Sequence, residues 1–124
     1  MVKSIGLDLV EVARIQNDLN RYGERFSGRI LGEEESPLFN ARRDKALFLA
    51  GRFAAKEAVI KALGTYLTER PAYSDIQIVN DPSGQPLLRL PETLVDRIPK
   101  FNSLISITHE KNYAAAVAIF EEEK

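Results

Sequence analysis

The sequence predicts an α+β fold, with helices packed on one face of a small, mainly antiparallel sheet. Helical patterns cluster in the first half of the chain, and strand patterns follow mostly in the second half. This segregation is typical of α+β folds. The length of 124 residues fits one domain with one hydrophobic core, so we expect residues 1–124 to form a single domain.

The first half begins with a strand pattern over residues 2–7, which ends at Asp8. Apolar residues then recur at helical spacing from Leu9 to about Tyr22, and Gly23 supplies a stop. Residues 26–40 should form a broken helix, because two glycines and a proline interrupt them.

A long helix is expected from about Arg43 to Leu63, with Gly64 at its C-terminal end. The remaining elements follow in order: a strand over 75–80, a turn over 81–86, its hairpin partner over 87–90, a short helix near 91–97, and strands over 104–108 and 113–120.

The last of these strands, residues 113–120, is apolar on both faces. In a chain this short, a strand that is apolar on both sides indicates a subunit interface. A central strand covered on both faces within one chain would give the same pattern.

Composition excludes several classes of function. The net charge of -1 disfavours a general nucleic-acid binder. The absence of cysteine excludes disulfides, thiolate metal sites and a thiol nucleophile, and the single histidine excludes a multi-histidine metal site within one chain. The chain has no signal-like start and no apolar run near the roughly 20 residues of a membrane span, so we expect a cytoplasmic protein.

The long helix carries charges within an apolar surface. Such charges are costly unless they are paired, reach solvent or hold a ligand. Glu57 and Lys61 are four residues apart, which predicts that their side chains meet on one face. Ala50 and Ala54 share that face and leave room beside the charges, so we expect a polar group to dock there. A Glu57–Lys61 ion pair without a ligand is the alternative.

Asp8 and Glu57 are candidate metal ligands. Two carboxylates brought together from distant positions repel each other unless a proton or cation joins them, and Mg²⁺ often binds one or two carboxylates plus phosphate oxygens and waters. The alternative for Asp8 is a capping box with Glu11, at the start of the first helix.

Basic residues supply a second candidate site. Arg52, Lys56 and Lys61 could neutralise a pyrophosphate, although long basic side chains also reach solvent from an apolar helix. The segment Ser106-Ile107-Thr108-His109 ends a strand and could bind a phosphate or a base edge, or could be ordinary turn chemistry.

A third group consists of Arg14, Arg21 and Arg25. If the first helix continues that far, all three lie within one narrow arc of its surface. Such a stripe could bind an acidic protein, and a solvated face with Asp18 paired to an arginine is the alternative.

Together these segments resemble the holo-acyl-carrier-protein synthase family, the short, single-domain 4′-phosphopantetheinyl transferases. The resemblance covers nearly the whole chain. It rests on these motifs: Ile5-Gly6-Leu7-Asp8 with Glu11 and Arg14, the stretch from Phe48 to Ala58 with Lys61-Ala62 and Gly64, Ser83-Gly84-Gln85-Pro86, and Ser106-Ile107-Thr108-His109.

The resemblance implies the reaction and the metal. The phosphopantetheine arm of coenzyme A would pass to a serine of apo acyl carrier protein in fatty acid biosynthesis, releasing adenosine 3′,5′-bisphosphate. Asp8 and Glu57 would hold Mg²⁺ against the pyrophosphate, and Lys61 would contact the phosphates. Longer relatives carry a second acid at the position of Val10, so water would complete the metal shell here. The general base stays open among Glu57, Asp8 and a carboxylate-held water.

The resemblance also implies the binding sites and the assembly. Arg52, Thr108 and His109 would hold the adenosine 3′-phosphate end, with Gly84 and Pro86 near the adenine. The arginines at positions 14, 21 and 25 would grip an acidic helix of the carrier protein. The family is trimeric, with its sites at subunit boundaries, in agreement with the apolar final strand.

Two functions from other classes compete with the transferase. A non-catalytic oligomer that binds coenzyme A or a similar nucleotide would keep the basic residues but would not need both acids. In a purely structural oligomer, each charged residue named above would serve only as a helix cap or in a surface ion pair.

Overall fold

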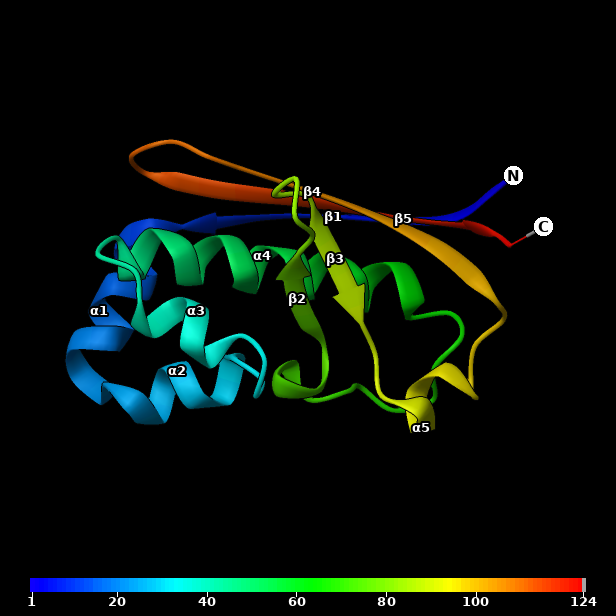
Figure 1. The fold of residues 1–124 in the computed structure, drawn as a ribbon, viewed down its shortest axis with the longest axis horizontal. Coiled ribbons are helices and arrows are strands. Elements are labelled where there is room, and N and C mark those ends of the chain that lie inside the picture. Colours follow the sequence, from blue (N-terminus) through cyan, green and yellow to red (C-terminus); the bar gives the residue numbers. More distant parts are fainter. Residues whose placement is uncertain (124) are drawn as a thin grey trace.

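The computed structural model describes residues 1–123, and a three-stranded antiparallel sheet forms one layer of it. The strands are β1 (Val2–Glu11), β4 (Phe101–His109) and β5 (Tyr113–Glu122), in the order β1-β5-β4. The long helix α4 (Lys45–Leu63) runs along the lower face of this sheet (Figure 1). Both edge strands of the sheet, β1 and β4, therefore contact the same helix.

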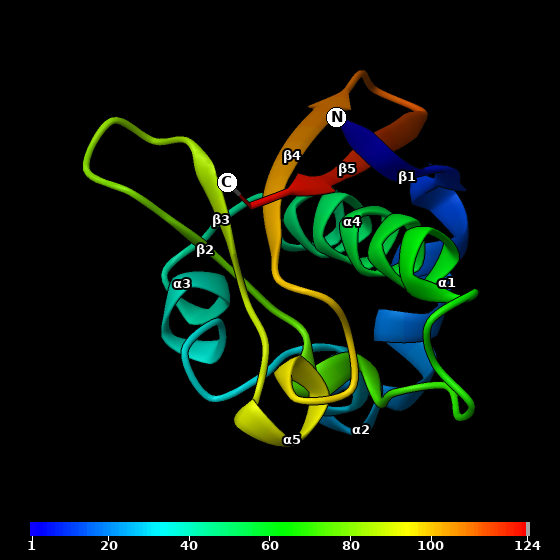
Figure 2. The same ribbon diagram turned by 90° about the vertical axis from the view of Figure 1, so that its right-hand side faces the viewer.

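The smaller elements lie on the far side of α4 and along the β4 edge (Figures 1 and 2). They are α1 (Val12–Tyr22), α2 (Glu24–Ile30), α3 (Ser36–Asn40), the 3-10 turn η1 (Tyr73–Asp75), the hairpin β2 (Gln77–Asn80) with β3 (Pro86–Arg89), and α5 (Glu92–Val95). Helix α1 lies on the β1 side, and the β2–β3 hairpin lies on the β4 side (Figure 2). The predicted α+β class is confirmed. No helix within residues 1–123 has both the length and the apolar character of a membrane span.

Strand β1 packs directly against α4 at Gly6. A Cβ atom on Gly6 would stand 1.8 Å from the carbonyl oxygen of Ala58, a distance that no side chain could tolerate. Because side chains alternate along a strand, Asp8 and the buried Val10 face the helix together with Gly6. The glycine therefore brings the Asp8 carboxylate onto the surface of α4.

The core is built around α4, where Leu49, Val59 and Leu63 are completely buried. Ala50 and Ala54 are also completely buried. Our expectation of open space beside the alanines is therefore wrong. Small side chains on α4 let the layers pack closely, and the space for a ligand lies elsewhere.

The boundary between β1 and α1 differs from the prediction. The strand continues to Glu11, because residues 8–11 pair in register with 113–116 of β5, and the helix begins only at Val12. Glu11 is the residue that precedes the helix, and its side chain makes no capping hydrogen bond. Asp8 lies inside a strand, so the capping-box alternative for this residue is wrong.

The first helix ends at Tyr22 because Gly23 takes a positive φ of 55°. Such a backbone conformation favours glycine and stops a helix. Arg25 lies in α2, a separate helix, whereas Arg14 and Arg21 lie on α1. The argument that placed all three arginines on one helical face therefore fails for Arg25.

The outer face of the sheet is apolar and open. Ile5, Leu7 and Leu9 of β1 are 62%, 65% and 65% exposed, and Leu104 of β4 is also exposed. The outward residues of β5, the central strand, are half-buried between them. Nothing within residues 1–123 covers this face, so the apolar pattern of β5 does not arise from burial on both sides within one chain.

Candidate active site

Asp8 and Glu57 line the same cavity, although 48 positions separate them in the sequence. The cavity has a volume of about 580 Å³ and lies at the β1 edge of the sheet. β1 contributes Asp8, α4 contributes Glu57 and Phe53, and Tyr73 and Arg14 complete its wall with other residues. The two predicted metal ligands therefore share one opening.

Lys61 holds the Asp8 carboxylate. Its Nζ lies 2.9 Å from Asp8 Oδ1 and donates a second hydrogen bond to the backbone oxygen of Leu7, at 3.0 Å. The Lys61 side chain is 53% exposed and that of Asp8 is 15% exposed, so the pair lies at the protein surface. Lys61 thus pairs with an acid on the neighbouring strand, and the alternative of a Glu57–Lys61 ion pair is not found within residues 1–123.

Glu57 is held by two other donors. Arg70 Nη2 lies 2.6 Å from Glu57 Oε1, and the Tyr73 hydroxyl donates to the same oxygen. Burial raises the pKa of the Tyr73 phenol, and its hydrogen bond to Glu57 raises it further. The phenol therefore stays protonated at neutral pH and acts as the donor.

These contacts leave each carboxylate with an oxygen for a cation. Within residues 1–123, donors reach Asp8 through Oδ1 and Glu57 through Oε1. Glu11 also lines the cavity, but no three such residues within 1–123 lie close enough together to share one ion, and Val10 is buried. Mg²⁺ typically binds one or two carboxylates and keeps waters or phosphate oxygens in its other positions. The residues present fit that requirement.

A second cavity of about 550 Å³ lies at the β4 edge. Arg52 of α4 is buried in its wall, where Nη2 lies 2.6 Å from Asn80 Oδ1 and Nε has no partner within the described chain. Burial lowers the pKa of Arg52, yet a guanidinium remains protonated at all relevant pH. Asn80 in turn donates to the Gly84 backbone oxygen at 2.8 Å, and Gly84 and Pro86 also line the cavity.

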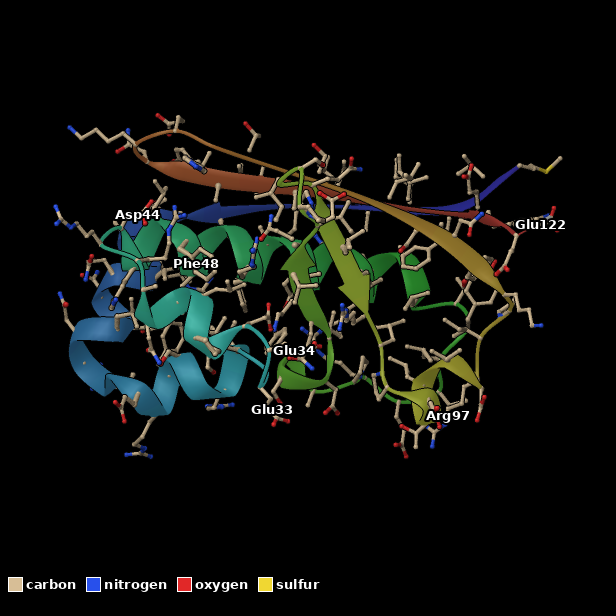
Figure 3. The ribbon with its side chains drawn as sticks, in the orientation of Figure 1. Glu33, Glu34, Asp44, Phe48, Arg97 and Glu122 are labelled. Atoms are coloured by element: carbon tan, nitrogen blue, oxygen red, sulfur yellow. The ribbon has the colours of Figure 1, made fainter. Side chains whose placement is uncertain are left out.

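His109 lines this second cavity from the end of β4, together with Asp44 and Phe48. Figure 3 shows Phe48 in the first turn of α4 and Asp44 just before the helix begins. Thr108 is exposed and does not line this cavity, although Leu104 and Ser106, on the same face of β4, do.

The sequence-predicted residues thus fall into two groups at opposite edges of one sheet. Asp8, Glu57 and Arg14 line the cavity at β1, with Lys61 attached through Asp8. The other group lines the cavity at β4 and consists of Arg52, Gly84, Pro86 and His109. Arg21 and Arg25 line neither cavity.

Comparison with known proteins identifies the family. Residues 4–118 match the family model of the 4′-phosphopantetheinyl transferase superfamily. A holo-[acyl-carrier-protein] synthase of Protochlamydia amoebophila is 41% identical over 120 residues, which cover 97% of this chain and 98% of that protein. The holo-[acyl-carrier-protein] synthase of Azoarcus sp. is 44% identical over 125 residues, covering 98% of each. The chain belongs to this superfamily.

Solved structures of superfamily members agree. The holo-[acyl-carrier-protein] synthase of Neisseria meningitidis superposes with a TM-score of 0.89 at 31% identity, covering 98% of this chain and 100% of that one. The enzyme from Bacillus anthracis, solved in complex with CoA (3′,5′-ADP), gives a TM-score of 0.83 at 34% identity, covering 99% of both chains. The resemblance found in the sequence is confirmed.

Sequence reasoning missed the role of Lys56 and did not single out Glu35. Both side chains are completely buried, and Lys56 Nζ lies 2.5 Å from Glu35 Oε1. Burial lowers the pKa of Lys56, and attraction to Glu35 opposes that shift. Lys56 therefore neither reaches solvent nor faces a cavity. Its place on the apolar arc of the helix was a signal of burial, but nothing in the sequence pattern pointed to Glu35 as its partner.

Proposed function

We propose that this chain is a holo-acyl-carrier-protein synthase, which transfers the 4′-phosphopantetheine group of coenzyme A to a serine hydroxyl of apo acyl carrier protein. The serine oxygen attacks the β-phosphorus of the pyrophosphate, and the bond from that phosphorus to the bridging oxygen breaks. Adenosine 3′,5′-bisphosphate leaves, and the serine proton passes to a base. The observation that carries this proposal is the shared cavity of Asp8 and Glu57 in a member of the transferase superfamily.

Asp8 and Glu57 are the residues that would hold Mg²⁺, through the oxygens that no protein donor contacts. Bound there, the ion would polarise the attacked phosphorus and offset charge on the leaving group. Lys61 already lies beside Asp8 and supplies a further positive charge for the phosphates. The base that accepts the serine proton stays open among Glu57, Asp8 and a water held by one of these carboxylates.

The cavity at β4 is proposed to bind the nucleotide end of coenzyme A. Arg52 presents a buried guanidinium whose Nε–H has no partner within the described chain, and such a group suits phosphate oxygens. His109 lies in the same wall, and Gly84 and Pro86 form the turn against which an adenine can pack. Thr108 precedes His109 at the end of β4 and is proposed to contact the same end of the ligand.

We also propose a homotrimer with its active sites at subunit interfaces. The two cavities open at opposite edges of the sheet in one chain, so a ligand that uses both must lie between two copies. The exposed apolar row of Ile5, Leu7 and Leu9 provides a surface that a second copy would cover.

Arg14, Arg21 and Arg25 are proposed to bind the acidic recognition helix of the carrier protein. Arg14 reaches the wall of the carboxylate cavity, which places the proposed docking surface next to the reaction. We place the reaction in the cytoplasm, within fatty acid biosynthesis.

Intact mass spectrometry of apo acyl carrier protein incubated with this chain, coenzyme A and Mg²⁺ tests the proposal. The carrier should gain the mass of one phosphopantetheine group, and omission of Mg²⁺ or the Glu57→Gln substitution should abolish the gain. If the wild-type chain leaves the carrier unmodified yet binds coenzyme A, the non-catalytic nucleotide binder is the better description.

A further inference from the structure

We propose that Tyr73 is a positioning residue for Glu57, and that the buried Glu35–Lys56 pair fixes Tyr73 where its hydroxyl reaches that carboxylate. This inference rests on the proposed function, because it treats Glu57 as a metal ligand. It assigns to residues that bind no metal themselves the role of keeping the Glu57 carboxylate oriented.

The hydroxyl end of Tyr73 is held between two partners. It donates to Glu57 Oε1, and Arg70 Nη2 lies 2.7 Å from the Tyr73 oxygen and 2.6 Å from the same Glu57 oxygen. The ring packs on Phe53, with ring centroids 5.2 Å apart and an angle of 59° between the planes. The phenol is therefore oriented by its ring as well as by its hydrogen bonds.

The backbone of Tyr73 is held by the residue adjacent to Glu57. Lys56 Nζ donates to the Tyr73 carbonyl oxygen at 3.0 Å. Since Lys56 and Glu57 are consecutive on α4, one turn of that helix contacts Tyr73 at both its backbone and its hydroxyl. A shift of η1 relative to α4 would break both contacts.

The Glu35 carboxylate anchors Lys56 in turn. It accepts hydrogen bonds from the Gly32 backbone N–H at 2.9 Å and the Ile78 backbone N–H at 3.2 Å, in addition to its bond with Lys56. Lys56 also donates to the backbone oxygen of Ile30. These contacts join the α2–α3 loop and β2 to α4, on both sides of the segment that carries Tyr73. A fully satisfied buried network of this kind is rigid.

The consequence concerns the free oxygen of Glu57. Tyr73 and Arg70 both occupy Oε1, which leaves Oε2 for a metal. Without the phenol, Glu57 keeps only Arg70, whose side chain is 57% exposed and therefore poorly fixed. Loss of a partner that orients a metal ligand typically costs about 10-fold to 100-fold in metal affinity.

The test is Tyr73→Phe, which removes the hydroxyl and keeps the ring on Phe53. Mn²⁺ binding to the protein loaded with coenzyme A is followed by electron paramagnetic resonance of the free ion, with coenzyme A alone as the blank. We expect about 10-fold weaker Mn²⁺ binding. The Mg²⁺ concentration for half-maximal turnover should rise by the same factor, and kcat should largely recover when Mg²⁺ saturates.

Tyr66→Phe is the matched control, because Tyr66 also packs against an aromatic ring, that of Phe101, but lines neither cavity. It should bind Mn²⁺ as the wild type does. A second variant, Arg70→Met, removes the other donor to Glu57 Oε1 from an exposed position and should weaken Mn²⁺ binding by a smaller factor than Tyr73→Phe.

Unchanged Mn²⁺ affinity in folded Tyr73→Phe would overturn the proposal, as would a loss of kcat that saturating Mg²⁺ does not restore. Failure of the proposed function gives a different result, since the wild-type chain itself would then not modify the carrier protein. If Tyr73→Phe does not fold, the same measurement is made on Glu35→Gln with Lys56→Met, which removes the Lys56 hydrogen bond to the Tyr73 backbone. Wild-type Mn²⁺ affinity in that folded double variant overturns the proposal.

Discussion

Helix α4 carries two lysine–carboxylate pairs only five residues apart, and their surroundings differ completely. Lys56 and Glu35 are both fully buried, and every hydrogen-bonding atom of the two groups contacts protein. Asp8 lines a cavity, and Lys61, which pairs with it, is 53% exposed. The same two kinds of side chain therefore serve the fold in one place and are available to a ligand in the other.

The difference follows from what each lysine meets. Lys56 projects into the region where α2, η1 and β2 converge, so backbone carbonyls and a buried acid surround it. Lys61 meets β1 close to the point where Gly6 brings the strand onto the helix. Removing one partner of a buried pair leaves an uncompensated charge, whereas removing one partner of an exposed pair leaves a hydrated one.

The largest expected effect comes from breaking the buried pair. Lys56→Met should lower the free energy of unfolding by about 3–5 kcal/mol, because Glu35 would remain charged and buried. Urea denaturation measures this loss. The double substitution Glu35→Gln with Lys56→Met removes both charges and should recover much of it. A single variant as stable as the wild type would show that the pair does not stabilise the fold.

The exposed pair should respond in the opposite way. Lys61→Met should change the free energy of unfolding by less than about 1 kcal/mol, because its side chain is half in solvent. It should lower kcat by about 100-fold through lost stabilisation of charge in the transition state. Lys61→Arg keeps the charge and should retain more activity. Equal losses of stability in Lys61→Met and Lys56→Met would remove the distinction between the two pairs.

A smaller effect is expected on the arginine surface of α1. Arg21→Ala should raise KM for apo acyl carrier protein about threefold, and make KM less sensitive to salt, because an exposed charge contributes modestly and is screened. Its KM for coenzyme A should not change, since Arg21 lines neither cavity. Arg97 is the control, an exposed arginine next to α5 at the other end of the molecule (Figure 3). If Arg97→Ala raised KM for the carrier protein equally, the effect would come from the net charge of the protein and not from a docking surface on α1.

Much of the fold was predictable because local patterns determine it. The α4 helix, the β2–β3 turn and the last two strands lie within a few residues of their expected places. The end of β1 was not predictable, because residues 8–11 are strand only through their pairing with β5. A tertiary contact overrides the helical spacing there.

The candidate site was predictable in its residue types but not in its arrangement. Motif resemblance pointed to Asp8 and Glu57 together, and they do share a cavity. Sequence spacing could not show that Lys61 pairs with Asp8 and Glu57 with Arg70, because both choices depend on how β1 and the segment before η1 lie on the helix. Sequence spacing also could not show that the candidate residues divide between two cavities, because that division depends on the order of the strands in the sheet.

The central claim is that Asp8 and Glu57 bind one divalent cation beside the pyrophosphate. A crystal structure of the protein with coenzyme A and Mn²⁺, with the metal located by anomalous scattering, tests this most directly. The account predicts a single ion in contact with both carboxylates and with a phosphate oxygen. An ion bound to only one of them, or coenzyme A bound with its pyrophosphate away from both, would contradict it.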